Sequence, residues 1–288
     1  MTRRWLSLVW LCCAGLAQAV TITDQRGVAV QFDQPPQRIV SLLPSLTEGV
    51  CALGACQRLV GVDRYSNHPA SVRQLPQLGG GIDPNVEAVL AARPDVVLLS
   101  LSARVDKRLE ALGLKVLALE PKTHADVQRV LQTLGQLLAV HPAQGAERVW
   151  REIDAGVQAA ASSLSPAARG TRVFFEVNRG PYAAGEASFM GETLKRLGVR
   201  NVVPAELGPF PRLNPEFVLR ADPDLIMIGS RSMQGGARYP GWSTLRAVRE
   251  QRLCVFDPEQ ADVLVRPGPR MAQAAQLMAQ CLNDKAAP

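Results

Sequence analysis

A stretch of sixteen residues occurs twice in this chain, at 85–100 and again at 214–229. In both copies an Asn precedes a helical pattern, a Glu lies in its first turn, and a Pro ends it. An apolar run without polar alternation follows, which predicts a strand buried on both faces of a sheet. Seven of the aligned positions are identical: Asn85/Asn214, Glu87/Glu216, Val89/Val218, Leu90/Leu219, Ala92/Ala221, Pro94/Pro223 and Asp95/Asp224. The repeat predicts two similar α/β lobes; the alternative is one α/β protein in which two such units arise independently.

Strands and helices alternate on either side of the repeat, which is typical of Rossmann-like lobes with parallel sheets. A hairpin is expected first, at 20–32. The first lobe is predicted to have strands at 38–42, 59–62, 95–100 and 115–119, and helices at 44–53, 104–112 and 126–140 besides the repeated one. The second is predicted to have strands at 172–177, 201–203, 225–228 and 252–256, and helices at 189–197, 242–250 and from 266 or 267 to 282. Ser45 and Glu48 match a capping box at the start of the helix at 44–53.

A long amphipathic helix is predicted at 142–164, near the middle of the chain. Apolar residues recur there at three- and four-residue steps, Pro142 suits a first helical turn, and Ser165-Pro166 ends the pattern. No strand directly precedes this helix. The predicted organisation is therefore an N-terminal α/β lobe at 20–141, a connecting helix at 142–164 and a C-terminal α/β lobe at 165–288.

The first nineteen residues have the features of a secretory signal peptide. Arg3 and Arg4 precede an apolar run that is too short to span a membrane, and Ala17-Gln18-Ala19 matches an A-x-A cleavage site. We therefore expect cleavage after Ala19 and a mature protein that works in the periplasm.

Four of the six cysteines lie beyond this segment, an even number in an oxidising compartment. Cys51 and Cys56 flank the end of a predicted helix, whereas Cys254 lies on a predicted strand and Cys281 on the last helix. We predict disulfides 51–56 and 254–281. Two pairs of free thiols are an alternative; a zinc site is disfavoured, because there is no CxxC motif and the histidines are scattered.

Charge and motifs argue against two classes of function. The formal net charge is +6, and Arg3 and Arg4 contribute two of these charges. The other arginines form no basic runs with interleaved aromatics, so no nucleic-acid partner is expected. The sequence also lacks G-x-S-x-G, H-E-x-x-H and P-loop motifs. An exported enzyme with a site assembled from distant residues, or a metal chaperone, remains an alternative.

Three aromatic residues are predicted to lie in loops that follow strand ends: Tyr65, Tyr182 and Phe210. Ligands of open α/β sheets bind beyond the carboxyl ends of the strands, so these rings are candidates for contacts with a large ring-bearing ligand between the lobes. The alternative is that each ring packs against its own lobe. Packing of this kind is expected for Trp242, at the start of a predicted helix.

Glu87 and Glu216 lie in the first turns of the two repeated helices. A carboxylate there interacts favourably with the helix dipole, which explains either glutamate by itself. Two acids at the same position on two lobes are also suited to docking onto a symmetric basic partner.

Three segments of the chain resemble the periplasmic substrate-binding proteins of the iron-complex and cobalamin ABC importers. They are 38–48 (RIVSLLPSLTE), 59–66 (LVGVDRYS) and the repeated unit around Arg93-Pro94-Asp95. The resemblance covers nearly the whole mature chain. It implies the class III periplasmic binding fold, with two Rossmann-like lobes and a rigid backbone helix at 142–164. It also implies that a metal chelate binds between the lobes and is delivered to a membrane permease with little hinge motion.

Within that family the cobalamin-binding branch is the most similar. The resemblance implies that Tyr65, Tyr182 and Phe210 contact a corrinoid, and that Glu87 and Glu216 pair with arginines of the permease. The tryptophans of that branch are missing near Gly80 and Ser100. Haem or a ferric siderophore is therefore the alternative ligand, with Tyr65 as an axial iron ligand or with contacts from Arg64, Arg179 or Arg212. No resident cofactor or metal site is expected, and a monomer is the default.

Overall fold

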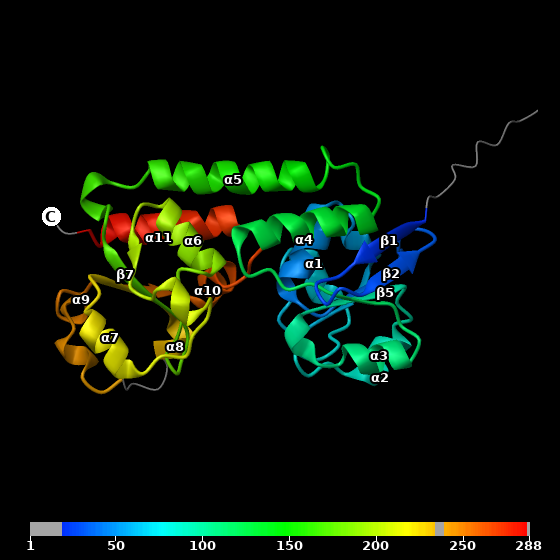
Figure 1. Ribbon diagram of the computed structural model, residues 1–288, viewed down its shortest axis with the longest axis horizontal. Helices are drawn as coiled ribbons and strands as arrows, with labels where there is room; N and C mark the ends of the chain where they lie inside the picture. Colours follow the sequence, from blue (N-terminus) through cyan, green and yellow to red (C-terminus); the bar gives the residue numbers. More distant parts are fainter. Residues whose placement is uncertain (1–18, 234–238, 287–288) are drawn as a thin grey trace, which may run out of the picture.

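One long helix, α5 (Ala146–Ser162), runs along one side of two α/β lobes that lie next to each other (Figure 1). The computed structural model describes residues 19–233 and 239–286, so the predicted signal peptide lies outside the described residues except for Ala19. The N-terminal lobe contains a four-stranded sheet and the C-terminal lobe a five-stranded one. This arrangement confirms the predicted fold class of two Rossmann-like lobes joined by a backbone helix.

When only parallel strands are counted, the two sheets share one strand order, in which the second strand of the lobe is followed by the first, the third and the fourth. In the N-terminal lobe this parallel order is β4 (Leu59–Val62), β3 (Ile39–Ser41), β5 (Val96–Leu99) and β6 (Val116–Ala118). In the C-terminal lobe it is β9 (Arg200–Asn201), β7 (Arg172–Asn178), β10 (Leu225–Gly229) and β11 (Leu253–Phe256), and β8 (Tyr182–Ala183) adds to β7 in the antiparallel direction. The predicted hairpin is present as β1 (Val20–Thr23) and β2 (Ala29–Phe32). The repeated apolar run is the third strand in both lobes, which supports the interpretation of the repeat as two similar lobes.

Equivalent side chains fix the start of the first strand in each lobe. The backbone N–H of Arg38 donates to Asp95 at 2.9 Å, and the N–H of Arg172 donates to Asp224 at 2.9 Å. Both arginine side chains also donate to the last carbonyls of the repeated helix of their own lobe. The similarity between the lobes therefore extends to strands whose sequences show no obvious repeat.

Helices cover the sheets, and in Figure 1 α2 (Val86–Ala91) and α7 (Pro215–Ala221) lie on the side opposite α5. Asn85 and Asn214 cap them as predicted, by accepting N–H bonds from Ala88 and Glu216. No helix within the described ranges has the length and apolar character that a membrane crossing requires. The other helices are α1 (Pro44–Ala52), α2 (Val86–Ala91), α3 (Asp106–Ala111), α4 (His124–Leu137), α6 (Phe189–Arg196), α7 (Pro215–Ala221), α8 (Ser230–Met233), α9 (Arg246–Arg249), α10 (Pro258–Leu264) and α11 (Met271–Asp284).

The predicted capping box at the start of α1 is wrong. Leu43 is the N-cap and makes no side-chain cap bond, Pro44 occupies the first helical turn, and Ser45 and Glu48 are buried. Proline favours that first position because its fixed φ suits a helix and its missing N–H is not needed there. The start of the helix is thereby moved two residues earlier than a cap at Ser45 requires, and Glu48 is free to make other contacts.

Two predicted helices begin later than expected. The connecting helix starts at Ala146 and not at Pro142, because Gly145 is its N-cap and the carbonyl of Pro142 accepts turn bonds from Gly145 and Glu147. The last helix starts at Met271, and a separate helix, α10, precedes it. A capping box of Asp257 with Gln260, followed by Pro258 in the first turn, begins α10. The predicted helix at 242–250 is split, and the other ends that differ do so by one to three residues.

Both predicted disulfides are confirmed. Cys51 and Cys56 are joined across the end of α1, with Cα atoms 4.0 Å apart. Cys254 on β11 is joined to Cys281 on α11, with Cα atoms 6.0 Å apart. The second bond fastens the edge strand of the C-terminal sheet to the last helix, so it closes a much longer loop than the first.

Removing the longer disulfide is expected to cost more stability than removing the shorter one. The sequence separation is 27 residues for Cys254–Cys281 and 5 for Cys51–Cys56. The chain-entropy relation then predicts that the free energy of unfolding falls by about 3 to 4 kcal/mol without the first disulfide and by about 2 kcal/mol without the second. Urea unfolding of Cys254→Ser/Cys281→Ser and Cys51→Ser/Cys56→Ser would measure both. Equal losses, or a larger loss for the 51–56 pair, would contradict the loop-length argument.

Candidate functional site

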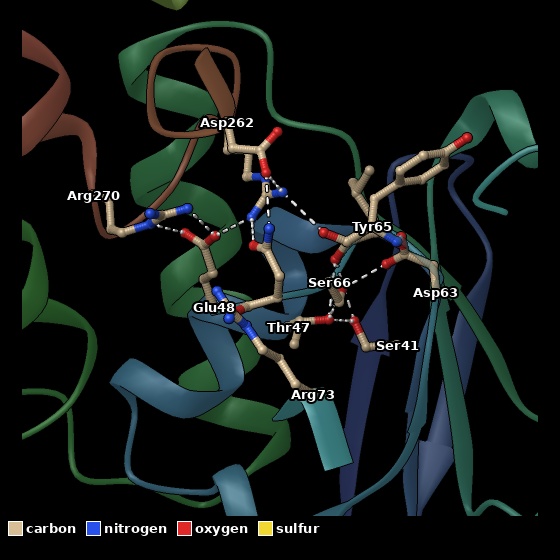
Figure 2. Close-up of polar contacts among 12 residues, drawn as sticks. Ser41, Thr47, Glu48, Asp63, Tyr65, Ser66, Arg73, Asp262 and Arg270 are labelled. Atoms are coloured by element: carbon tan, nitrogen blue, oxygen red, sulfur yellow. Dashed lines mark hydrogen bonds and ion pairs between the residues drawn. The ribbon is translucent and has the colours of Figure 1, made fainter. Parts of the chain in front are cut away.

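A buried carboxylate of the N-terminal lobe, Glu48 on α1, binds two arginines of the C-terminal lobe (Figure 2). Arg266 donates from Nη1 to Oε1 at 3.0 Å. Arg270 donates from Nε to Oε2 at 3.0 Å and from Nη2 to Oε1 at 2.7 Å. The side chain of Glu48 is 2% exposed and that of Arg266 is 6% exposed. Charges buried this deeply are stable only when they are paired, so this cluster holds the two lobes together.

The guanidinium of Arg266 also binds the loop that follows β4. It donates from Nη1 to Oδ1 of Asn67 at 2.7 Å and from Nη2 to the backbone carbonyl of Tyr65 at 2.9 Å. Asp262, one turn earlier on α10, lies 2.8 Å from Nη2 and accepts a 2.8 Å bond from the amide of Asn67. A single arginine of the C-terminal lobe thus contacts three residues of the N-terminal lobe.

The same loop is held from inside its own lobe by Asp63. Its Oδ1 accepts the backbone N–H of Tyr65 at 2.8 Å and its Oδ2 accepts the hydroxyl of Ser66 at 2.6 Å. Thr47 continues this buried chain of bonds to Ser66 at 2.9 Å and to Ser41 at 2.8 Å. Burial raises the pKa of the Asp63 carboxyl, against the opposing effect of the bonds from Ser66 and Tyr65. Figure 2 shows the ring of Tyr65 extending away from these contacts.

A small cavity of about 280 Å³ lies where the two lobes meet beside Tyr65. Its lining comes from both lobes: Leu43, Pro44, Ser45 and Tyr65 on one side, and Asp262, Val265, Arg266 and Pro267 on the other. A second contact between the lobes lies at the start of α4, where the ring of His124 bonds the carbonyl of Phe189 at 3.1 Å and the hydroxyl of Thr193 at 2.9 Å. The space between the lobes is therefore bounded by contacts at two places.

The predicted ligand aromatics are exposed, and two of them lie together. Tyr182 and Phe210 are each 38% exposed and lie on adjacent segments, which are joined by bonds from Ala183 to Pro211 at 3.0 Å and from Gly185 to Pro209 at 2.9 Å. Tyr65 is 57% exposed and belongs to the other lobe. Tyr182 and Phe210 thus lie on two hydrogen-bonded segments of the C-terminal lobe, and Tyr65 lies on the N-terminal lobe. Their contact with a ligand stays a prediction.

Trp242 packs within its own lobe, as predicted. It is buried and lies 5.8 Å from Phe174 and 4.5 Å from Tyr239, measured between ring centroids. An arginine lies over each of the two exposed tyrosines: Arg64 at 6.0 Å from the ring of Tyr65 and Arg212 at 5.9 Å from that of Tyr182. Across the described part of the chain, no three side chains of His, Cys, Asp or Glu gather as a metal site.

Glu87 and Glu216 are exposed at equivalent ends of α2 and α7, one in each lobe. The Glu87 side chain is 78% exposed and forms only a long ion pair with Arg108, at 3.4 Å. In Figure 1 both helices lie on the side of the molecule opposite α5. The two acids thus belong to helices on the same side of the protein, as docking would require. That docking itself stays a prediction.

Glu176, near the end of β7, is a buried carboxyl of the C-terminal lobe. The hydroxyl of Tyr239 donates to its Oε1 at 2.9 Å and accepts the N–H of Gly180 at 2.6 Å. Its Oε2 is buried without a hydrogen-bond partner among the described residues. Burial raises the pKa of Glu176 to about 7, although the bond from Tyr239 and the charge of Arg179 act in the opposite direction. Glu176 therefore changes charge near neutral pH.

The contribution of Glu176 to the stability of the protein is expected to fall as the pH rises from about 4.5 to about 7 and then to level off. Within this window the unfolded chain has lost the proton of Glu176 and the folded chain has kept it. The free energy of unfolding should fall by about 3 kcal/mol across this window. Urea unfolding across this pH range should show the slope, and Glu176→Gln, which cannot ionise, should flatten it. An equally steep slope in the Gln variant would contradict the assignment.

The sequence did not reveal the cluster of Glu48, Asn67, Asp262, Arg266 and Arg270. Glu48 and Arg266 are separated by 218 positions, so no local pattern joins them. One signal was present: Glu48 lies between Leu46 and Val50 on α1, which are both buried, and a charged residue at such a place needs a partner. The identity of that partner depends on how the lobes pack, which the local sequence does not encode.

Comparison with known proteins agrees with this architecture. The family described as periplasmic binding protein matches residues 39–260. A vitamin B12-binding protein of Pectobacterium atrosepticum is 28% identical over 262 residues, which cover 88% of this chain and 91% of the relative. An ABC transporter substrate-binding lipoprotein of Bacillus subtilis is 27% identical, over 91% of this chain and 85% of its own length. The crystal structure of a periplasmic heme-binding protein from Pseudomonas aeruginosa is 30% identical with a TM-score of 0.74, over 88% of this chain and 95% of that one.

Proposed function

The chain belongs to the periplasmic binding protein family, and we propose that it captures a corrinoid for an ABC importer. The observation that carries the proposal is the set of exposed rings supplied by both lobes, Tyr65 on one and Tyr182 and Phe210 on the other. Large aromatic side chains contribute most to the free energy of binding when a flat apolar ligand covers them. Relatives named as vitamin B12-binding proteins, which align over most of this chain, support the choice of ligand.

Location and delivery follow from the same proposal. The signal peptide predicted at 1–19 exports the protein to the periplasm, where an inner-membrane permease receives the loaded protein. Glu87 and Glu216 dock onto basic residues of that permease, because exposed charges on two lobes favour an oppositely charged, two-fold arrangement. The protein acts as a monomer and has no catalytic role in this scheme.

Calorimetric titration of the mature protein, from Val20, with cyanocobalamin tests the ligand. We expect one site with a Kd below about 1 µM. Tyr65→Ala should weaken binding by about 2 kcal/mol, or roughly thirtyfold, as expected for an aromatic residue central to an interface. Leu112→Ala, which removes an exposed apolar side chain at the end of α3, is the matched control and should not change the Kd. No heat from a folded protein would reject the corrinoid.

Haem is the second candidate, and two observations favour it. The phenol of Tyr65 is exposed, as an axial iron ligand must be, and the relative from Pseudomonas aeruginosa is named as a heme-binding protein. Titration with haemin separates the two ligands. An iron–tyrosinate absorption band that disappears in Tyr65→Phe would establish haem, whereas tight cyanocobalamin binding without such a band would establish the corrinoid.

A further inference from the structure

We propose that Arg266 is a positioning residue for the ligand ring of Tyr65, and that it does this from the opposite lobe. The role of Tyr65 as a ligand-binding ring rests on the proposed function, whereas the hydrogen bonds of its backbone do not depend on it. Arg266 does not hydrogen-bond the ring hydroxyl of Tyr65. The contact is with its backbone carbonyl, at 2.9 Å (Figure 2).

Both backbone polar groups of Tyr65 are held by charged side chains. The N–H is fixed by Asp63 of its own lobe at 2.8 Å, and the carbonyl is fixed by Arg266 of the other lobe at 2.9 Å. Hydrogen bonds to charged groups are stronger than neutral ones, and burial strengthens them further. The backbone at Tyr65 is therefore fixed between two lobes, although the ring is more than half exposed.

Arg266 is itself prevented from moving. Its guanidinium bonds Glu48, Asn67 and Asp262 as well as Tyr65, and its side chain is almost fully buried. The planar fork of an arginine can bind several acceptors at fixed angles, which a lysine ammonium on a flexible stem cannot do. A ring whose backbone is fixed before the ligand arrives has less conformational entropy to lose on binding, so the arginine contributes to affinity without touching the ligand.

Arg270 provides a matched control for this idea. Like Arg266, it comes from the C-terminal lobe and bonds Glu48, so either substitution leaves Glu48 with one arginine partner. Only Arg266 reaches the Tyr65 loop. A role in general lobe contact predicts the same effect from both positions, whereas a positioning role predicts an effect on Tyr65 from Arg266 alone.

Fluorine NMR of the protein labelled with 3-fluorotyrosine tests the proposal without any ligand. The chain has three tyrosines, Tyr65, Tyr182 and Tyr239, so three signals are expected, and Tyr65→Phe assigns the one of interest. In Arg266→Lys the Tyr65 signal should shift and broaden while the other two stay in place. The lysine keeps a positive charge beside Glu48 and so protects the fold. In Arg270→Met the Tyr65 signal should be unchanged. An unmoved Tyr65 signal in Arg266→Lys, or equal changes in both variants, would overturn the proposal.

Titration with cyanocobalamin then connects the position of the ring to binding. Arg266→Lys should weaken the affinity about three- to tenfold, the cost of ordering one side chain, and Arg270→Met should stay within about twofold of the wild type. An unchanged affinity in Arg266→Lys would show that the fixed position of Tyr65 has no functional value. If the wild type does not bind cyanocobalamin, the proposed ligand is rejected, and the fluorine spectra still decide whether Arg266 positions Tyr65.

Discussion

Replacing Glu87 and Glu216 together with alanine is expected to abolish ligand uptake and to leave the affinity of the purified protein unchanged. The two carboxylates are exposed at equivalent helix starts of the two lobes, on helices that lie on the side opposite α5 (Figure 1), so they are suited to bind a permease and not the ligand. Interfacial charges of this kind steer and orient docking, and losing both removes the recognition from each lobe. The stability should change little, since exposed ion pairs such as Glu87 with Arg108 contribute at most about 1 kcal/mol.

Uptake into proteoliposomes that contain the permease would measure this effect. Each single variant should retain part of the activity, because one lobe can still dock. The matched control is Glu147→Ala/Glu152→Ala, which removes two largely exposed acids from α5 on the other side of the molecule and should transport normally. Normal uptake by the Glu87/Glu216 double variant would exclude docking through these residues.

Removing the carboxylate of Glu48 is expected to destabilise the protein more than any other single substitution considered above. Glu48→Ala leaves Arg266 and Arg270 buried without their shared counter-charge, and breaking a buried ion pair in this way costs about 3 to 5 kcal/mol. Glu48→Gln should have an intermediate effect, since its amide oxygen can accept one of the arginine bonds but carries no charge.

Urea unfolding gives the comparison directly. Glu206→Ala serves as a control, because this glutamate is exposed and a surface substitution of this kind changes stability by no more than about 0.5 kcal/mol. A Glu48→Ala variant as stable as the control would mean that water enters the cluster and solvates the arginines. The cluster could not then hold the lobes together in the way described.

The sequence predicted the parts of the fold that local chemistry determines. Asn85 and Asn214 cap their helices, and the apolar runs after Pro94 and Pro223 are the buried third strands, because capping, proline and burial act within a few residues. The same local reasoning assigned Glu48 to a capping box, since S-x-x-E has the same appearance in a cap and in a buried first turn. Pro44 in the first helical turn distinguishes the two, whereas the arginines that bind Glu48 lie far along the chain, on the other lobe.

The candidate site was predictable to a lesser degree. The loop positions of Tyr65, Tyr182 and Phe210 follow from strand ends, which the sequence shows. The pairing of Tyr182 and Phe210 on one surface depends on contacts between residues 181–185 and 209–213, two irregular segments without a periodic pattern. The role of Arg266 depends on α10, a short helix that was missed because its apolar pattern is weak, although its capping box was present.

The ion cluster between the lobes contains two acids, Glu48 and Asp262, and two arginines, Arg266 and Arg270, so its net charge is zero. A neutral, buried cluster is little screened by dissolved ions, whereas exposed charges that meet a partner across water are strongly screened. Ionic strength therefore acts on the two halves of the transport cycle differently. Added salt should slow the encounter of Glu87 and Glu216 with the permease and leave the geometry around Tyr65 as it is.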